Sequence, residues 1–75
     1  MSLKRDLAKE IQVLEDEIKE LEAKRLRSMA SLLESVISKT EVGTDEARFF
    51  RNYSAEIEVK REKLIQLKKQ LADLL

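Results

Sequence analysis

Apolar residues in the first half of the chain recur at alternating intervals of four and three, with mostly charged residues between them. The repeat consists of Leu7, Ile11, Leu14, Ile18 and Leu21. This spacing places the apolar side chains on one stripe of an α-helix and is typical of the core positions of a coiled coil. Pairs such as Glu15 with Lys19, four residues apart, each add about 0.3 kcal/mol to the helix. The pattern predicts a first helix over about residues 3–40.

The second half of the chain carries the same repeat in a more regular form. Its core positions are Phe50, Tyr53, Ile57, Lys60, Leu64, Leu67, Leu71 and Leu74, and Lys60 is the one basic interruption. These positions predict a second helix over about residues 45–74. At 1.5 Å per residue, each helix should be roughly 45 to 50 Å long.

The only glycine of the chain, Gly43, lies between the two patterns. Glycine readily adopts the left-handed conformation that ends helices, and Thr44 after it suits the N-cap of a following helix. Asp45 and Glu46 would then lie in the first turn, where the helix dipole favours carboxylates. The turn should cover about residues 41–44. The whole chain, 1–75, is therefore expected to form one all-α domain, an antiparallel two-helix coiled-coil hairpin.

An antiparallel hairpin requires facing core positions to have a constant sum of residue numbers. A sum of 85 places the turn between Val42 and Gly43, where the composition also places it. The resulting pairs are Ile11 with Leu74, Leu14 with Leu71, Ile18 with Leu67, Leu21 with Leu64, Leu32 with Tyr53, and Ser35 with Phe50.

The charged residues beside the core agree with this register only in part. Opposite charges face each other in Glu15 with Lys68 and Glu22 with Arg61, and such pairs help to select the pairing of two helices. Like charges also meet in this register, at Arg25 with Lys60 in the core and at Lys24 with Lys63 beside it. We expect these long side chains to splay toward solvent.

A second apolar stripe lies beside the first one near the predicted turn. It consists of Leu26, Met29, Leu33, Val36 and Ile37. A two-helix hairpin does not need so wide an apolar arc. We therefore predict that this stripe, with Phe49 as a contributor, is an interface. A second copy of the chain, giving a four-helix bundle, is favoured over another helical protein as the partner.

Composition narrows the classes of function. A chain of 75 residues buries little core on its own, and without cysteine or histidine it has neither disulfides nor a structural zinc site to stabilise it. Self-association or a partner is the remaining route. No apolar run approaches a membrane span, and the N-terminus does not resemble a signal peptide, so an intracellular, most simply cytoplasmic, location is expected.

Catalytic chemistry is not expected. The chain lacks histidine, cysteine and a glycine-rich phosphate loop, and its clustered serines have no activating partners: Ser28, Ser31, Ser35 and Ser38. We expect no cofactor, no metal and no small-molecule substrate. The favoured function is a non-enzymatic interaction or assembly module.

Two alternatives use charged residues. A nucleic-acid-binding hairpin would use a basic patch that the register above places at one level of the rod: Lys24, Arg25, Arg27, Lys60, Arg61 and Lys63. Zero formal net charge and the absence of interleaved aromatic residues place this hypothesis second. The third hypothesis is an acidic tip that acts on a larger machine through Glu41, Asp45 and Glu46.

The hairpin and these three tip residues resemble the N-terminal coiled-coil hairpin of Gre-type transcript cleavage factors, whose globular domain has no counterpart in these 75 residues. The hairpin also resembles the small plasmid RNA-binding hairpin that dimerises into a four-helix bundle. Both resemblances concern the fold, and neither includes a diagnostic motif.

Overall fold

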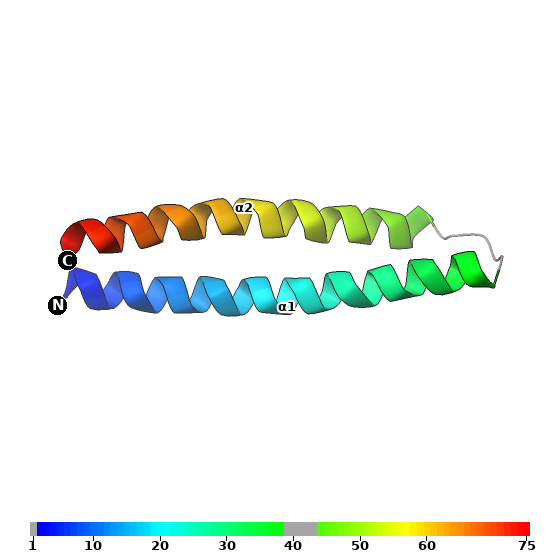
Figure 1. Ribbon diagram of the computed structural model, residues 1–75, viewed down its shortest axis with the longest axis horizontal. Helices are drawn as coiled ribbons and strands as arrows, with labels where there is room; N and C mark the ends of the chain where they lie inside the picture. Colours follow the sequence, from blue (N-terminus) through cyan, green and yellow to red (C-terminus); the bar gives the residue numbers. More distant parts are fainter. Residues whose placement is uncertain (1, 39–43) are drawn as a thin grey trace.

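The computed structural model describes residues 2–38 and 44–75, which form two helices. Helix α1 spans Leu3–Ile37 and helix α2 spans Thr44–Leu74. The helices run antiparallel and pack on each other along a rod of 56 × 15 × 14 Å, with both termini at the end opposite the tip (Figure 1). The predicted all-α helical hairpin is confirmed. We call the half of the rod near the termini the stem.

The ends of α1 follow from local hydrogen bonds. At the start, the Ser2 hydroxyl accepts from the Arg5 amide at 3.4 Å. At the end, the amide and the hydroxyl of Ser38 both donate to the Glu34 carbonyl, at 2.9 and 2.7 Å. Helix α1 therefore ends at Ile37 with Ser38 as its C-cap residue, three residues before the predicted end. The predicted turn residues 41–43 lie outside the described residues.

The core follows the predicted heptad positions. The buried side chains are Leu7, Ile11, Leu14, Ile18, Leu21, Ile57 and Leu67, with Tyr53, Leu64 and Leu71 packed against them. Ile57 has an exposed fraction of 0%. Each large aliphatic side chain buried in this way contributes about 1.5–3 kcal/mol relative to its exposed state, so this stripe supplies most of the stability of the hairpin.

The two helices are nevertheless paired one heptad away from the predicted register. Lys60 Nζ lies 2.8 Å from Glu17 Oε2, and Lys60 shares a groove with Leu14. The predicted register would place Lys60 opposite Arg25, about 12 Å farther along α1 than Glu17. Facing core positions therefore sum to about 78 rather than 85. The corrected pairs are Leu7 with Leu71, Ile11 with Leu67, Leu14 with Leu64, Ile18 with Lys60, and Leu21 with Ile57.

Both ends of the rod agree with the shifted register. Leu7, which the predicted register leaves without a partner, has an exposed fraction of only 8%, whereas Leu74 at the chain end is 37% exposed. At the other end, α1 extends past the start of α2 (Figure 1). Tyr53 lines a groove with Lys24 and Ser28, not at the level of its predicted partner.

Electrostatics explain why this register is preferred. A shift of seven residues keeps every core position facing a core position, so apolar burial hardly distinguishes the two registers. The shift separates Lys60 from Arg25 and sets Lys60 beside Glu17. It also brings Lys24 and Glu56 to the same groove in place of the predicted meeting of two lysines. The charge conflicts of the predicted register are thereby removed.

The two predicted ion pairs at the edge are confirmed even though the register differs. Glu15 and Lys68 approach to 3.5 Å, and Glu22 and Arg61 approach to 2.6 Å. In the observed register the two residues of each pair are not directly opposite each other. Each lies closer to the C-terminus of its own helix than the residue that directly faces its partner. Helical side chains lean toward the N-terminus of their helix, so the two charged groups lean toward each other.

Candidate interaction surfaces near the tip

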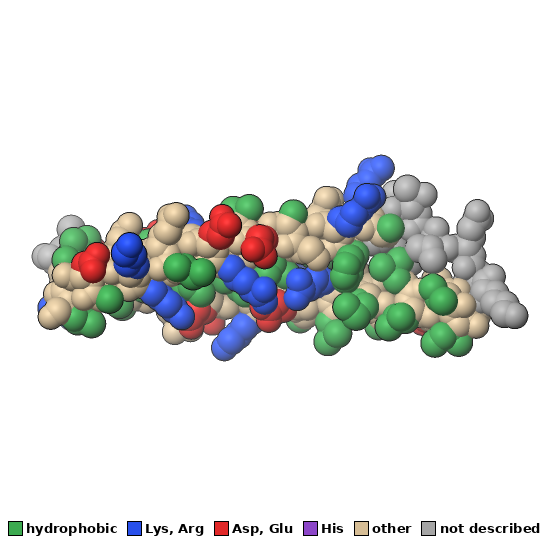
Figure 2. All heavy atoms as spheres, turned by 45° about the horizontal axis from the view of Figure 1, so that its top comes forward, with side chains coloured by type: hydrophobic (Ala, Val, Ile, Leu, Met, Phe, Trp, Pro, Cys, Tyr) green, Lys and Arg blue, Asp and Glu red, His purple; other side chains and the backbone are tan. Residues whose placement is uncertain are grey.

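The second apolar stripe of α1 remains uncovered in the folded hairpin. We call it the tip face, and it consists of Leu26, Met29, Leu33, Val36 and Ile37, with exposed fractions between 41% and 82%. Figure 2 shows hydrophobic side chains gathered over the half of the molecule nearer the tip, whereas charged side chains dominate the stem. The sequence-based prediction of an over-wide apolar arc matches this exposure.

The tip face continues an edge of the hairpin that is charged in the stem. Met29 follows Glu22 by seven residues, so the two side chains share one edge of α1. On α2, Ser54 precedes Arg61 by the same interval. Toward the tip, this edge therefore carries the large apolar Met29 and Val36 on α1 and the small Ser54 and Ala47 on α2.

The size of the tip face sets it apart from scattered surface leucines. Five large side chains at these exposures present on the order of 500 Å² of surface, within the range of the largest apolar patch on a typical monomer, which is often functional. Two-helix packing leaves the patch open because α2 covers only the stripe that includes Leu21 and not the stripe beside it. The arrangement suits packing against a further helix.

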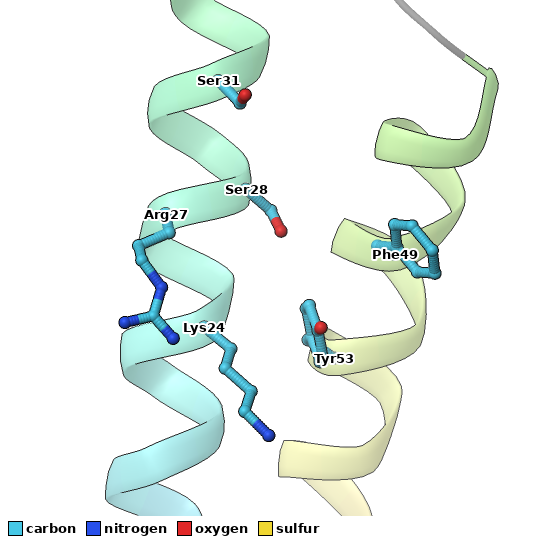
Figure 3. A pocket seen from close by; sticks show the side chains of 6 residues that line it. All are labelled: Lys24, Arg27, Ser28, Ser31, Phe49 and Tyr53. Atoms are coloured by element: carbon cyan, nitrogen blue, oxygen red, sulfur yellow. The ribbon is translucent and has the colours of Figure 1, made fainter.

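Phe49 does not lie on the tip face, contrary to the prediction that it contributes there. It lies on the opposite edge of the hairpin, in a groove of about 330 Å³ (Figure 3). The groove is lined by Lys24, Arg27, Ser28, Ser31, Phe49 and Tyr53. In Figure 3 the Lys24 and Tyr53 side chains extend into the space between the helices, whereas the Phe49 ring lies over α2 and points away from α1, and Arg27 lies on the side of α1 away from α2.

Sequence reasoning missed this groove because it depends on the register. In the predicted register, Tyr53 faces Leu32 and no aromatic residue approaches Lys24 or Arg27. The one-heptad shift moves Tyr53 and Phe49 to the level of these cations. The unfavourable meeting of Arg25 with Lys60 was the signal in the sequence that pointed to a different register.

The predicted basic patch is divided by the same shift. Lys60, Arg61 and Lys63 lie one heptad farther into the stem than predicted, so the six residues do not share one level of the rod. Three of them are paired with carboxylates: Lys60 with Glu17 at 2.8 Å, Arg61 with Glu22 at 2.6 Å, and Lys24 with Glu20 at 3.6 Å. Within residues 2–38 and 44–75, Arg25 and Arg27 form no ion pair.

The ammonium of Lys60 is the group whose titration responds most clearly to this arrangement. Its hydrogen bond to Glu17 raises the pKa of Lys60 above the ordinary value of 10.5; desolvation opposes this shift, and attraction to the carboxylates of Glu17 and Glu56 adds to it. This lysine therefore acts as a charged member of the core stripe, held by a carboxylate of the facing helix.

The predicted acidic tip is only partly within the described structure. Glu41 lies outside the described residues. Asp45 and Glu46 belong to the first turn of α2, and only their backbone is described. Their suggested contacts with a larger machine stay a prediction.

Comparison with protein-family models, curated proteins and solved structures finds no match for this chain. Neither α1 nor α2 has an apolar segment long enough to cross a membrane. In the part of the chain that the structure describes, no three acidic side chains gather in a way that could hold a metal ion.

Proposed function

We propose that this hairpin is a non-enzymatic interaction module that packs its tip face against helices of a partner. The observation that supports this most directly is the exposure of Leu26, Leu33 and Val36 after the hairpin has buried its own core. Exposed apolar patches of this size on soluble proteins commonly mark protein interaction sites.

The mechanism is the burial of apolar surface between helices. Removing a few hundred square ångströms of apolar surface from water is favourable by roughly 25 cal/mol per Å², and the loss of free movement on association offsets much of that gain. Ala47 and Ser54 are small residues on the same side of α2 as the tip face, and they leave room for an approaching helix. Association should therefore be reversible and should depend on protein concentration.

Analytical ultracentrifugation of the wild type and of Leu33→Glu with Met29→Glu tests the proposal. A matched control, Val59→Glu with Ile65→Glu, introduces the same charge at exposed apolar positions of the stem. The wild type and the control should form larger species at micromolar concentration, and the tip-face variant should remain monomeric. Circular dichroism checks that all three are helical. A helical wild-type monomer that the substitutions leave unchanged contradicts self-association through this face.

A second candidate function, contact with single-stranded nucleic acid, is supported by the composition of the groove. Binding of single strands commonly combines cations with aromatic rings on which bases stack, and the lining of this groove includes both kinds of residue: Lys24 and Arg27 from α1, and Phe49 and Tyr53 from α2. The ion pair of Lys24 with Glu20 weakens the local positive potential, which keeps this candidate second.

Fluorescence anisotropy with a labelled oligonucleotide at low salt tests the second candidate. Lys24→Glu with Arg27→Glu should abolish binding, whereas Lys9→Glu with Lys69→Glu, which changes the net charge equally, should weaken it only slightly. Affinity should also fall steeply as salt is added. Equal losses in the two variants would indicate nonspecific attraction to positive charge, and no binding by the wild type would end this hypothesis.

A further inference from the structure

We infer that the partner of the tip face is a second copy of this chain, packed antiparallel so that the two tips overlap and the two stems point in opposite directions. The inference rests on the proposed function and adds to it the identity of the partner and the register of the contact.

The tip face is self-complementary in an antiparallel arrangement. If Leu26 of one copy faces Val36 of the other, then Met29 faces Leu33, because both pairs have the same sum of residue numbers. A single two-fold axis near residue 31 of α1 generates these contacts of Leu26, Met29, Leu33 and Val36, while Ile37 lies at the edge of the overlap, level with Arg25 of the other copy. Closed two-fold dimers use one patch on both subunits in this way.

Charges on the same edge disfavour the parallel alternative. Toward the stem the same stripe continues with charged residues. Lys19 lies seven residues before Leu26, and Glu22 and Glu15 lie seven and fourteen residues before Met29. A parallel dimer would set each of these residues beside its own copy, and like charges meeting across an interface are unfavourable. In the antiparallel arrangement these residues lie beyond the overlap and remain solvated.

The edge partners of α2 allow the close approach that this arrangement needs. Ala47 and Ser54 are half-buried and small, and they lie on the edge of α2 that is on the same side of the hairpin as the tip face. A second α1 can therefore lie along this edge without displacing a large side chain of α2. The middle of the overlap would then contain four helices, while each stem keeps only two.

The available area indicates a weak dimer. About 500 Å² from each copy gives a total near 1,000 Å², at the low end of specific interfaces. The shape is distinctive. With the axis near residue 31, the two stems extend the particle to roughly 90 Å at 1.5 Å per residue, whereas a side-by-side parallel dimer would keep the 56 Å length of the monomer.

Single-cysteine cross-linking tests the arrangement directly, because the chain contains no cysteine. Ala30, which is exposed, lies on the flank of the tip face next to the proposed axis, so the two copies of Ala30→Cys should meet. Lys19→Cys is the matched control, since Lys19 lies on the same stripe in the stem. A short bismaleimide reagent should link Ala30→Cys at least tenfold faster than Lys19→Cys, and addition of Leu33→Glu should abolish the link.

Each other outcome overturns the inference in a recognisable way. Comparable linking at both positions indicates a parallel dimer. A dimer by light scattering that Ala30→Cys does not link indicates a different register, and the tip-face proposal survives if Leu33→Glu still dissociates that dimer. A chain that remains monomeric at millimolar concentration overturns self-association itself. In every case, small-angle scattering measures whether the particle has the expected length.

Discussion

Lys60 reaches across the hairpin to Glu17, with 2.8 Å between Nζ and Oε2, and so joins the middle of α2 to α1. The pair places a cation within the core stripe at a level where the facing helix supplies a carboxylate. A lysine at this position contributes to the pairing of the helices in a way that leucine would not, because it distinguishes between registers that bury equal apolar area.

The first prediction concerns pH. Because folding raises the pKa of Lys60 above 10.5, its contribution to stability is fully present below pH 10.5 and is lost as the pH rises through the higher folded value. Urea denaturation at neutral pH and at pH values above 10.5 should show this alkaline loss. Glu17→Gln should reduce the loss relative to the wild type. An identical alkaline loss in both proteins would contradict the prediction.

The second prediction concerns the register. Leu14→Cys with Leu64→Cys should form an intramolecular disulfide under mild oxidation, because these positions face each other. Leu14→Cys with Leu71→Cys should not, because the two sites are then offset by seven residues, about 10 Å, beyond the Cα separation a disulfide tolerates. Mass spectrometry of the oxidised monomers distinguishes the two. Preferential closure of the second pair would favour the register with a sum of 85.

The third prediction concerns the core. Ile57→Ala should lower the free energy of unfolding by about 2–5 kcal/mol, because it opens a cavity at a fully buried position in a small protein. Ile65→Ala is the control, since Ile65 is exposed, and should change that free energy by less than about 0.5 kcal/mol. Urea titration followed by circular dichroism measures both at one protein concentration. Equal losses of the free energy of unfolding in the two variants would contradict the burial of Ile57 and the exposure of Ile65.

The fourth prediction concerns the edge ion pair of Glu22 with Arg61. A double-mutant cycle with Glu22→Gln and Arg61→Gln should give a coupling energy of about 0.2–1 kcal/mol, as expected for partly exposed pairs. The coupling should diminish as salt is raised. A coupling that does not change between low salt and molar salt would show that the pair interacts by something other than charge.

The sequence predicts the core stripe well because its physical cause is local. A spacing of three and four residues determines which side chains share a helix face, so the burial of Leu7 through Leu21 follows without knowledge of the partner helix. The exposure of the tip face is predictable for the same reason. The same local spacing shows that the core stripe and the tip face together are too wide for both to face α2.

The register is harder to predict because it depends on a comparison between nearly equal alternatives. Core positions repeat every seven residues, so a shift of one heptad leaves apolar contacts almost unchanged. The pairs of Glu15 with Lys68 and Glu22 with Arg61 form in the shifted register as well, because long side chains span the offset. The groove beside Tyr53 depends on the register and was missed with it.

The position of the two chain ends has a mechanical consequence. Both termini lie at the stem end of the rod (Figure 1). A force that pulls the termini apart therefore acts on one core layer at a time, beginning with Leu7 and Leu71, instead of shearing all layers together. The helices would separate progressively, and the layers near the tip would be the last to open. Under tension, the tip face would be the last surface of this hairpin to lose its shape.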